Sequence, residues 1–147
     1  MSRSIYIAPN LMEKIYDSGE AAYPEEAAGL MLGTTSGEAR HVVHLVTFDN
    51  ARELPARHNR YLLTPDDYLH GEQEAERMGL ELIGVFHSHP DHPNRPSEFD
   101  REWAMPWWSY IITSVERGRA AGSRSWVLSE DRSGFVEEPI LVAAREA

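Results

Sequence analysis

The stretch HSHPDHPNRPSEFD, residues 87–100, holds the side chains of this sequence that are best suited to bind a metal ion. Three histidines and three acidic residues stand among its fourteen positions, together with three prolines. Imidazole nitrogens and carboxylate oxygens are common zinc ligands in proteins. The chain has no cysteine, which excludes thiolate ligands and disulfides. The stretch therefore predicts a metal site that is held by His, Asp or Glu.

The first two histidines follow an apolar segment, residues 81–89, that predicts a buried β-strand. Side chains two positions apart on a strand point to the same face of the sheet. His87 and His89 should therefore project together at the end of this strand, as a pair of imidazole ligands. Ser88 should point to the other face and orient backbone rather than react.

A short helix is expected to supply a carboxylate ligand. Ser97 suits the N-cap, Asp100 lies one turn further along, and Pro106 stops the helix early. Each of the intervening prolines fixes its own φ angle, so the loop is stiff enough to hold Asp100 over the histidines. Two histidines and one carboxylate leave a fourth zinc position for water, which is the pattern of a catalytic zinc site rather than a structural one.

A second motif overlaps the same letters. HSHPDH, residues 87–92, matches the H-x-H-x-D-H signature of the metallo-β-lactamase fold, in which Asp91 and His92 would be further ligands. That fold needs downstream histidines and a longer chain, and no histidine follows His92. We therefore interpret Asp91 and His92 as loop residues.

The remaining segments predict an α+β fold, a mixed β-sheet flanked by two or three helices, in one domain over residues 1–147. Asn10 should cap a helix that runs to about residue 17, and Thr64 one that begins at Pro65 and ends near Gly79. Residues 51–60 have the composition of a surface loop. The expected strands are residues 4–8 (an edge strand), 27–33, 41–48, a short one at 61–63 directly before Thr64, 81–89, 109–115, 125–129 and 134–143.

Charge and hydropathy exclude several classes of partner. The net charge of −10 disfavours nucleic acid, because phosphate binding needs a basic surface. No apolar run reaches the roughly 18 residues of a membrane span, and the first residues lack a signal-peptide core. We therefore expect a cytoplasmic protein without a membrane partner. The acidity itself has two explanations, adaptation to genome composition or high salt and steering of a basic protein partner.

The full spacing resembles the JAMM motif of the MPN-domain (MPN+) zinc metallopeptidases. HSHP at residues 87–90 is followed by six residues and then by S-x-x-D at residues 97–100, as in that family. The resemblance covers residues 5–142 and is to the prokaryotic single-domain type. It implies an MPN/JAMM domain, with a cytidine-deaminase-like architecture.

The family also has an upstream glutamate, usually in the pattern E-x-x-G-L-L-x-G beside a proline. The matching segment here is PEEAAGLMLG, residues 24–33. The spacing to Gly29 selects Glu26 over its neighbour Glu25. The alternative for Glu26 is a solvated acid in the acidic pair Glu25–Glu26.

The resemblance implies a role for each motif residue. His87, His89 and Asp100 would bind one zinc ion per chain, with water in the fourth position. Glu26 would accept the proton of that water and pass it to the leaving amine. Ser97 would donate a hydrogen bond to the oxyanion of the tetrahedral intermediate, so its role as a helix cap is expected to be partial.

The resemblance also implies a class of substrate. The family cuts the amide or isopeptide bond after the C-terminal Gly-Gly of a ubiquitin-like protein, and some prokaryotic members process small β-grasp sulfur-carrier proteins. Such a tail would bind in an extended conformation as an added strand, with only glycine fitting beside the metal. The alternative is a metal-bound or inactive MPN scaffold that binds ubiquitin-like proteins without cleaving them.

Two groups of residues remain outside the motif. His41, His44, His58 and His70 have no spacing partner, so they are interpreted as core or surface histidines. Trp103, Trp107 and Trp108 are interpreted as core residues, one of which could wall the cleft.

Overall fold

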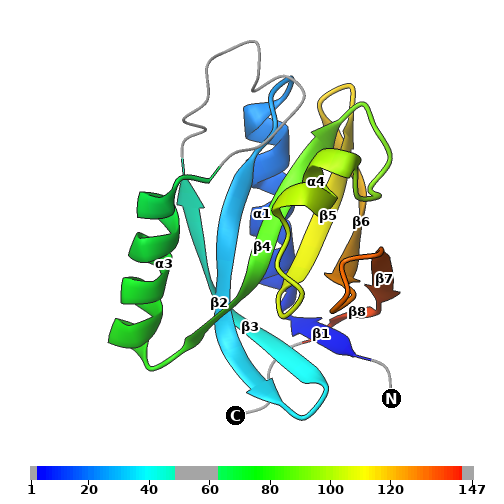
Figure 1. Ribbon diagram of the computed structural model, residues 1–147. Helices are drawn as coiled ribbons and strands as arrows, with labels where there is room; N and C mark the ends of the chain where they lie inside the picture. Colours follow the sequence, from blue (N-terminus) through cyan, green and yellow to red (C-terminus); the bar gives the residue numbers. More distant parts are fainter. Residues whose placement is uncertain (1–2, 49–62, 144–147) are drawn as a thin grey trace.

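The computed structural model describes residues 3–48 and 63–143, and the predicted loop at residues 51–60, with His58, and the first two residues of the strand predicted at 61–63 lie outside them. The described chain forms one eight-stranded sheet in the order β7-β6-β5-β4-β2-β3-β1-β8 (Figure 1). The elements are β1 (Ser4–Ile7), α1 (Pro9–Ala22), β2 (Ala28–Ser36), β3 (Ala39–Phe48), α3 (Pro65–Met78), β4 (Glu81–Pro90), α4 (Glu98–Trp103), β5 (Ser109–Glu116), β6 (Arg119–Leu128), β7 (Phe135–Glu138) and β8 (Ile140–Val142).

The sheet is mixed, as predicted. β1 runs parallel to β3 and β8, and β4 runs parallel to β5, whereas the other neighbouring strands are antiparallel. Helix α1 covers one face of the sheet, and α3 and α4 lie on the other (Figure 1). This arrangement confirms the α+β class, a mixed sheet flanked by helices.

Each face of the sheet carries its own apolar core. Alternate side chains of a strand point to opposite faces, so Leu30 packs on the α3 side while Met31 packs on the α1 side. Val85 and Phe86 divide between the two cores in the same way. Strands buried on both faces read as continuous apolar runs, which explains segments such as GLMLG in β2.

The same alternation sets the direction of the motif side chains on β4. Val85 faces the α3 side, so His87 and His89 face that side too, while Ser88 follows Phe86 to the α1 side. Gly19 lets α1 pack closely against this face, because an added Cβ would lie 3.0 Å from Cγ2 of Val115 and 3.3 Å from the Cβ of Ser88.

The first segment of the chain departs from its prediction. β1 was expected at an edge, but it lies between β3 and β8, with Ile5 and Ile7 fully buried. Helix α1 begins at Pro9 rather than after an Asn10 cap, since proline is preorganised for the first helical position, and Ala8 at the cap makes no side-chain hydrogen bond. The helix also continues to Ala22 instead of ending near residue 17.

Three predicted strands have different bounds. The strand expected at residues 27–33 continues to Ser36, where it turns back into β3, and the strand expected at 125–129 begins at Arg119. The strand expected at 134–143 is two strands, β7 and β8, because Pro139 separates them and has no N–H for a ladder. β7 and β8 are the two ends of the strand order, so the sheet must curl until its edges approach each other.

Helix α3 forms as predicted. Thr64 caps it and accepts a hydrogen bond from the amide of Asp67, while the Asp67 carboxylate accepts one from the amide of Thr64, and Pro65 occupies the first turn. Gly79 ends the helix in the left-handed conformation, with φ of 69°, which glycine adopts without strain.

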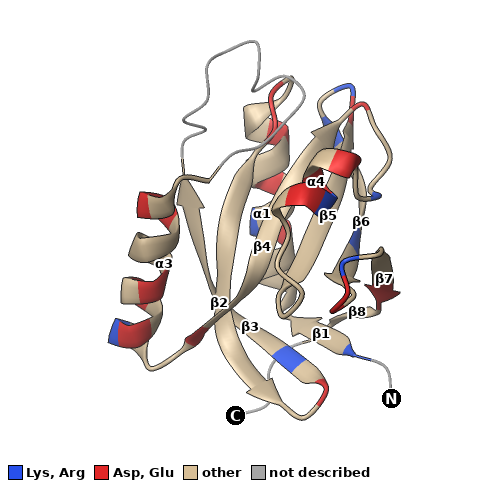
Figure 2. Ribbon diagram, in the orientation of Figure 1, with Lys and Arg blue, Asp and Glu red and all other residues tan. Residues whose placement is uncertain are grey.

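Acidic side chains lie on α1, α3, α4 and β7 rather than in one cluster (Figure 2). Within residues 3–48 and 63–143, no helix combines the length and the apolarity that a membrane span requires.

Candidate metal centre and catalytic site

The end of β4 carries the histidine pair of the site. His87 and His89 are 1% and 8% exposed, and their ring centroids lie 5.0 Å apart. Both rings project to the side of the sheet on which α4 lies, as the strand alternation predicted. Two buried imidazoles side by side are a pair of nitrogen donors.

Helix α4 brings Asp100 against both rings. Its carboxylate Oδ1 lies 3.5 Å from His87 Nε2, and Oδ2 lies 3.3 Å from His89 Nε2. Two ligand atoms of a tetrahedral zinc site lie about 3.4 Å apart, since each is roughly 2.0–2.2 Å from the metal. The donor types and these separations therefore fit zinc.

A backbone carbonyl determines which ring nitrogen of His89 is available to bind a metal ion. Its Nδ1 lies 2.8 Å from the carbonyl oxygen of Pro93. A carbonyl can only accept, so Nδ1 carries a hydrogen and donates it, and in the neutral ring Nε2 keeps its lone pair. This contact resembles the outer-shell bonds that orient metal-binding histidines, and it presents Nε2 toward Asp100.

Asp100 is held in place by the start of its own helix. The amide of Ser97 donates to Asp100 Oδ2 at 2.7 Å, and Ser97 Oγ accepts a hydrogen bond from the Asp100 amide at 3.1 Å. Ser97 is therefore a full N-cap, and the expectation of a partial cap is wrong. The cap uses a lone pair of Oγ, so the hydroxyl hydrogen can still be donated elsewhere.

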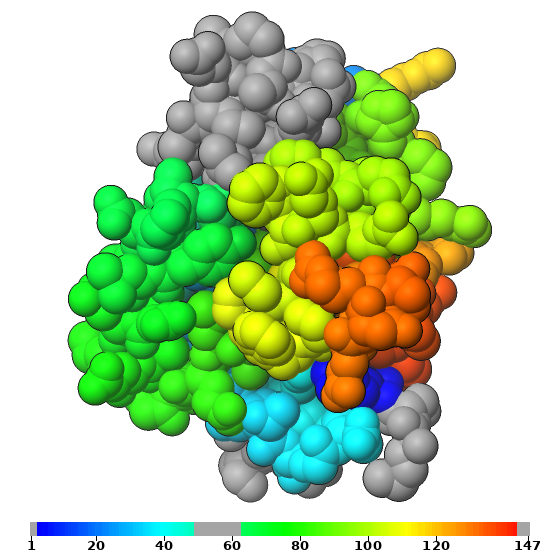
Figure 3. Space-filling view, in the orientation of Figure 1, coloured from blue at the N-terminus to red at the C-terminus, as the bar shows by residue number. Residues whose placement is uncertain are grey.

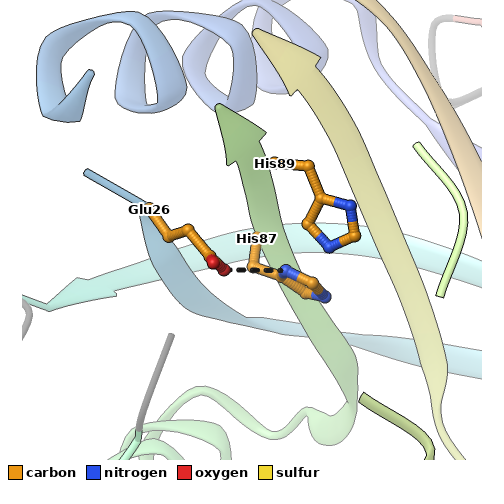
Figure 4. A group of neighbouring side chains, drawn as sticks. All are labelled: Glu26, His87 and His89. Atoms are coloured by element: carbon orange, nitrogen blue, oxygen red, sulfur yellow. Dashed lines mark ion pairs between the residues drawn. The ribbon is translucent and has the colours of Figure 1, made fainter. Parts of the chain in front are cut away.

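Glu26 reaches the site from the residues that precede β2. Its Oε1 lies 3.8 Å from His87 Nδ1, and one ligand atom from each of Glu26, His87 and His89 lies within 4.8 Å of the others (Figure 4). The two nitrogens of His87 thus face different acids, Nε2 facing Asp100 and Nδ1 facing Glu26. Glu26 is 4% exposed.

Ser88 holds the segment that carries Glu26. The buried amide of Ala27 donates to Ser88 Oγ at 2.8 Å, and the amide of Ser88 donates to the carbonyl of Ala27 at 3.0 Å. Ser88 therefore orients backbone, as predicted. Gly29 allows the strands to lie this close, because an added Cβ would clash with the ring of Phe86.

The charges of the site favour an ionised carboxylate. Burial acts to raise the pKa of Asp100, but His87 and the hydrogen bond from His89 outweigh burial and lower the pKa to about 2. Burial acts to lower the pKa of His89, and the hydrogen bond and charge of Asp100 outweigh it, so that the pKa is raised. A proton on His89 therefore competes with a metal ion for Nε2.

The site opens into a cavity of about 340 Å³. The sequence did not predict three of the lining residues, Pro93, Arg95 and Phe99, as site residues. Their only sequence signal was their position inside the stretch 87–100. The residues around the cavity are Glu26, His89, His92, Pro93, Arg95, Ser97, Phe99 and Asp100.

Asp91, a ligand in the metallo-β-lactamase motif, has a different role. Its Oδ2 accepts a hydrogen bond from the hydroxyl of Tyr23 at 2.6 Å, and its Oδ1 accepts one from the amide of Arg117 at 2.8 Å. Both carboxylate oxygens of Asp91 therefore accept hydrogen bonds at the surface, one from Tyr23 and one from Arg117. His92 lines the cavity. Within the described chain, both His92 and Asp100 lie outside the group formed by Glu26, His87 and His89, but Asp100 contacts the Nε2 atoms of His87 and His89.

The other histidines lie away from the site. His41 stacks on Tyr6 at 4.8 Å between ring centroids, and His70 meets the edge of Phe48 at 6.0 Å. His44 is half-buried on β3.

The expectation that the tryptophans belong to the core is wrong for two of them. Trp103 and Trp107 are 56% and 60% exposed. Trp108 is partly buried and stacks on Tyr68, with ring centroids 5.5 Å apart.

Known proteins resemble this chain over most of its length. A probable TtuB-protein conjugate cleaving protease from Thermus thermophilus is 29% identical over 119 residues, which are 79% of this chain and 74% of that protein. A desampylase from Haloferax volcanii is 30% identical over 110 residues, which are 74% of this chain and 75% of that protein.

Solved structures share the fold. A solution structure from Desulfitobacterium hafniense is 29% identical, with a TM-score of 0.82, and covers 96% of this chain and 94% of its own. One from Salinibacter ruber is 40% identical, with a TM-score of 0.75, and covers 97% and 94%. A JAB1/MPN domain protein from Archaeoglobus fulgidus, 19% identical, has a TM-score of 0.55 and covers 95% and 97%.

The family assignment agrees with the resemblance that the motif spacing indicated. Residues 8–129 match the family described as prokaryotic homologs of the JAB domain. This range includes Glu26, both histidines of the pair, Ser97 and Asp100. The chain belongs to this family of prokaryotic JAB-domain proteins.

Proposed function

We propose that this protein is a zinc-dependent peptidase or isopeptidase that hydrolyses the amide bond after the C-terminal Gly-Gly of a ubiquitin-like or β-grasp sulfur-carrier protein. The observation that carries the proposal is the buried group of His87, His89 and Asp100, with Glu26 beside it and a cavity in front. His87, His89 and Asp100 would hold one zinc ion per chain. A bound zinc ion would activate a water molecule as a nucleophile at neutral pH.

Glu26 would serve as the general base and then as the general acid. Its carboxylate faces the His87 nitrogen that is turned away from Asp100, so it can lie beside the metal ligands without being one. It also lines the cavity in which a substrate would lie. From there it would accept a proton from the attacking water and deliver it to the leaving amine.

Ser97 would stabilise the developing oxyanion. Its Oγ is fixed by the hydrogen bond from the Asp100 amide, and it lines the same cavity. The hydroxyl hydrogen would be donated to the oxygen of the attacked carbonyl, where negative charge develops in the transition state. A donor that is already oriented needs no rearrangement during the reaction.

The names of the relatives support the substrate class. The Thermus thermophilus protein is named for the cleavage of TtuB-protein conjugates, and the Haloferax volcanii protein is named a desampylase. By analogy, the partner of this chain would be a small protein that is conjugated through its C-terminus. A cytoplasmic location and a single domain over residues 1–147 are part of the proposal, with neither nucleic acid nor membrane as a partner.

The test is a cleavage assay with purified protein and a carrier that is joined through Gly-Gly to a second protein. Two substrates are needed, one with a peptide bond and one with a lysine isopeptide bond. We expect cleavage after Gly-Gly, identified by mass spectrometry, that stops on chelation and returns with added zinc. A matched substrate that ends in Ala-Ala should remain intact. Zinc and carrier binding without any cleavage would support the scaffold alternative instead.

A further inference from the structure

A second pocket lies next to the catalytic cavity, and its lining is mainly apolar. It has a volume of about 710 Å³ and lies between the start of α3, helix α4 and residues 105–108. Figure 3 shows this face of the molecule, with the green residues of α3 beside the yellow-green residues of α4 and the yellow segment that follows α4. The lining residues that matter most are Tyr68, Phe99, Trp103, Trp107 and Trp108.

Phe99 connects the two pockets. It lines the catalytic cavity together with Ser97 and Asp100, and it also lines the apolar pocket. Along α4 it is followed one turn later by Trp103, with ring centroids 6.2 Å apart. A ligand bound in the catalytic cavity can therefore continue into the apolar pocket over the ring of Phe99.

The apolar pocket has the side chains of a recognition site. Trp103 and Trp107 leave more than half of their surface exposed, although large aromatic side chains are usually buried. Exposed tryptophans beside a cavity are typical of binding surfaces, where they bury a large area when a partner arrives. Tyr68 and Trp108, stacked on each other, support the pocket from the side of α3.

The length of α4 sets the distance from the scissile bond. From Ser97, at the N-cap, to Trp103 the helix rises by about 9 Å, at roughly 1.5 Å per residue. An extended chain covers this distance in about three residues, at roughly 3.3 Å each. A side chain about three to five residues from the scissile bond would therefore reach the pocket.

We propose that this pocket binds a large apolar side chain of the carrier tail, located about three to five residues from the scissile bond on the acyl side. The inference rests on the proposed function and adds a specificity determinant to it. The acyl side is favoured because the carrier tail is common to all conjugates, whereas the amine side varies with the conjugated protein. Gly-Gly would occupy the catalytic cavity, and the apolar residue before it would select the tail.

Binding of tail peptides tests the pocket without requiring catalysis. Peptides that end in Gly-Gly would carry leucine or alanine at the third, fourth or fifth position from the C-terminus. Intrinsic fluorescence can report binding, since three of the four tryptophans border the pocket. We expect leucine to bind about tenfold or more tighter than alanine at one of these positions, which is the discrimination that an apolar pocket achieves.

The variants Trp103→Ala and Trp107→Ala should reduce this leucine preference to about twofold or less. Both side chains are largely exposed, so the variants should keep the fold, which far-UV circular dichroism checks. Val136→Ala is the matched control, because Val136 is 65% exposed on β7 and does not border the pocket. It should keep the full preference.

The outcomes separate this inference from the proposed function. Equal binding of leucine and alanine tails at all three positions, or a preference that survives Trp107→Ala, would overturn the pocket assignment. In peptides that continue beyond Gly-Gly, a preference seen only for leucine placed after the scissile bond would overturn the acyl side. If the leucine preference holds but no Gly-Gly conjugate is cleaved in the presence of zinc, the proposed function fails while the pocket assignment stands.

Discussion

At the scale of single residues, the ring of His87 separates the two carboxylates of the site. Its Nε2 lies 3.5 Å from Asp100, and its Nδ1 lies 3.8 Å from Glu26. The Nδ1 of His89 is taken by the Pro93 carbonyl, so His89 presents Nε2 to Asp100, as His87 also does. A metal ion would therefore lie among two Nε2 atoms and Asp100, and Glu26 would be available for proton transfer.

We expect His87→Ala and Asp100→Ala each to abolish stoichiometric zinc binding, because each removes one of the three proposed zinc ligands. His92→Ala should still bind one zinc ion per chain, since the His92 side chain lines the cavity, whereas the histidine contacts with Asp100 come from His87 and His89. Metal analysis of dialysed protein measures the stoichiometry. Complete loss of zinc in His92→Ala would favour the metallo-β-lactamase arrangement.

The sequence predicted most of this site because its signals are local. His87 and His89 are two apart on one strand, and Ser97 and Asp100 form a capping pair at the start of one helix. The contact of His89 with Pro93 could not be predicted, because it depends on how the loop folds back. Glu26 lies 61 residues before His87 in the chain, so its selection depended on the family pattern rather than on spacing within one element.

At the scale of elements, the site depends on the contact between β4 and the segment that enters β2. Ser88 and Ala27 exchange two hydrogen bonds, so the direction of Glu26 is tied to the strand that carries the histidines. Glu26 and the two histidines are therefore fixed relative to each other by the pairing of these two segments.

Replacing Ser88 with alanine should lower the free energy of unfolding by about 1–3 kcal/mol, because the buried amide of Ala27 would lose its acceptor. Chemical denaturation measures the change. Ser36→Ala, at the exposed end of β2, is the control and should stay within about 0.5 kcal/mol of the wild type. An unchanged stability in Ser88→Ala would show that water satisfies the Ala27 amide.

Elements with complete local signals were predicted closely, and the others were not. Helix α3 has a capping box, a proline in its first turn and a glycine at its end, and its bounds matched. The first half of β6, from Arg119, is polar and only partly buried, so it lacks the apolar pattern of a strand. Its strand character comes from pairing with β5, which is a tertiary effect.

At the scale of the whole molecule, two apolar cores hold the sheet independently of the site. One core joins the sheet to α1 and the other joins it to α3. The proposed metal ligands lie at the end of β4 and on α4 and are not members of either core. The fold should therefore not depend on a metal ion.

Chelation should leave the protein folded, with a native far-UV circular dichroism spectrum and a modestly lower melting temperature. The temperature falls because a ligand that binds only the folded state stabilises it in proportion to RT ln(1 + [L]/Kd). Adding zinc back should restore the original value. An unfolded spectrum after chelation would instead identify a structural zinc site.

The central claim is that Glu26 moves protons beside the metal ligands, and the cleavage rate of Glu26→Gln tests it most directly. Glutamine keeps the shape of the side chain but cannot act as a base, so zinc content, fold and carrier binding should be retained. Cleavage of a Gly-Gly carrier fusion should slow by at least about a hundredfold, within the range that general acid–base catalysis provides. Glu25→Gln, one position away, should cleave nearly like the wild type. A Glu26→Gln variant that cleaves at the wild-type rate would contradict the account.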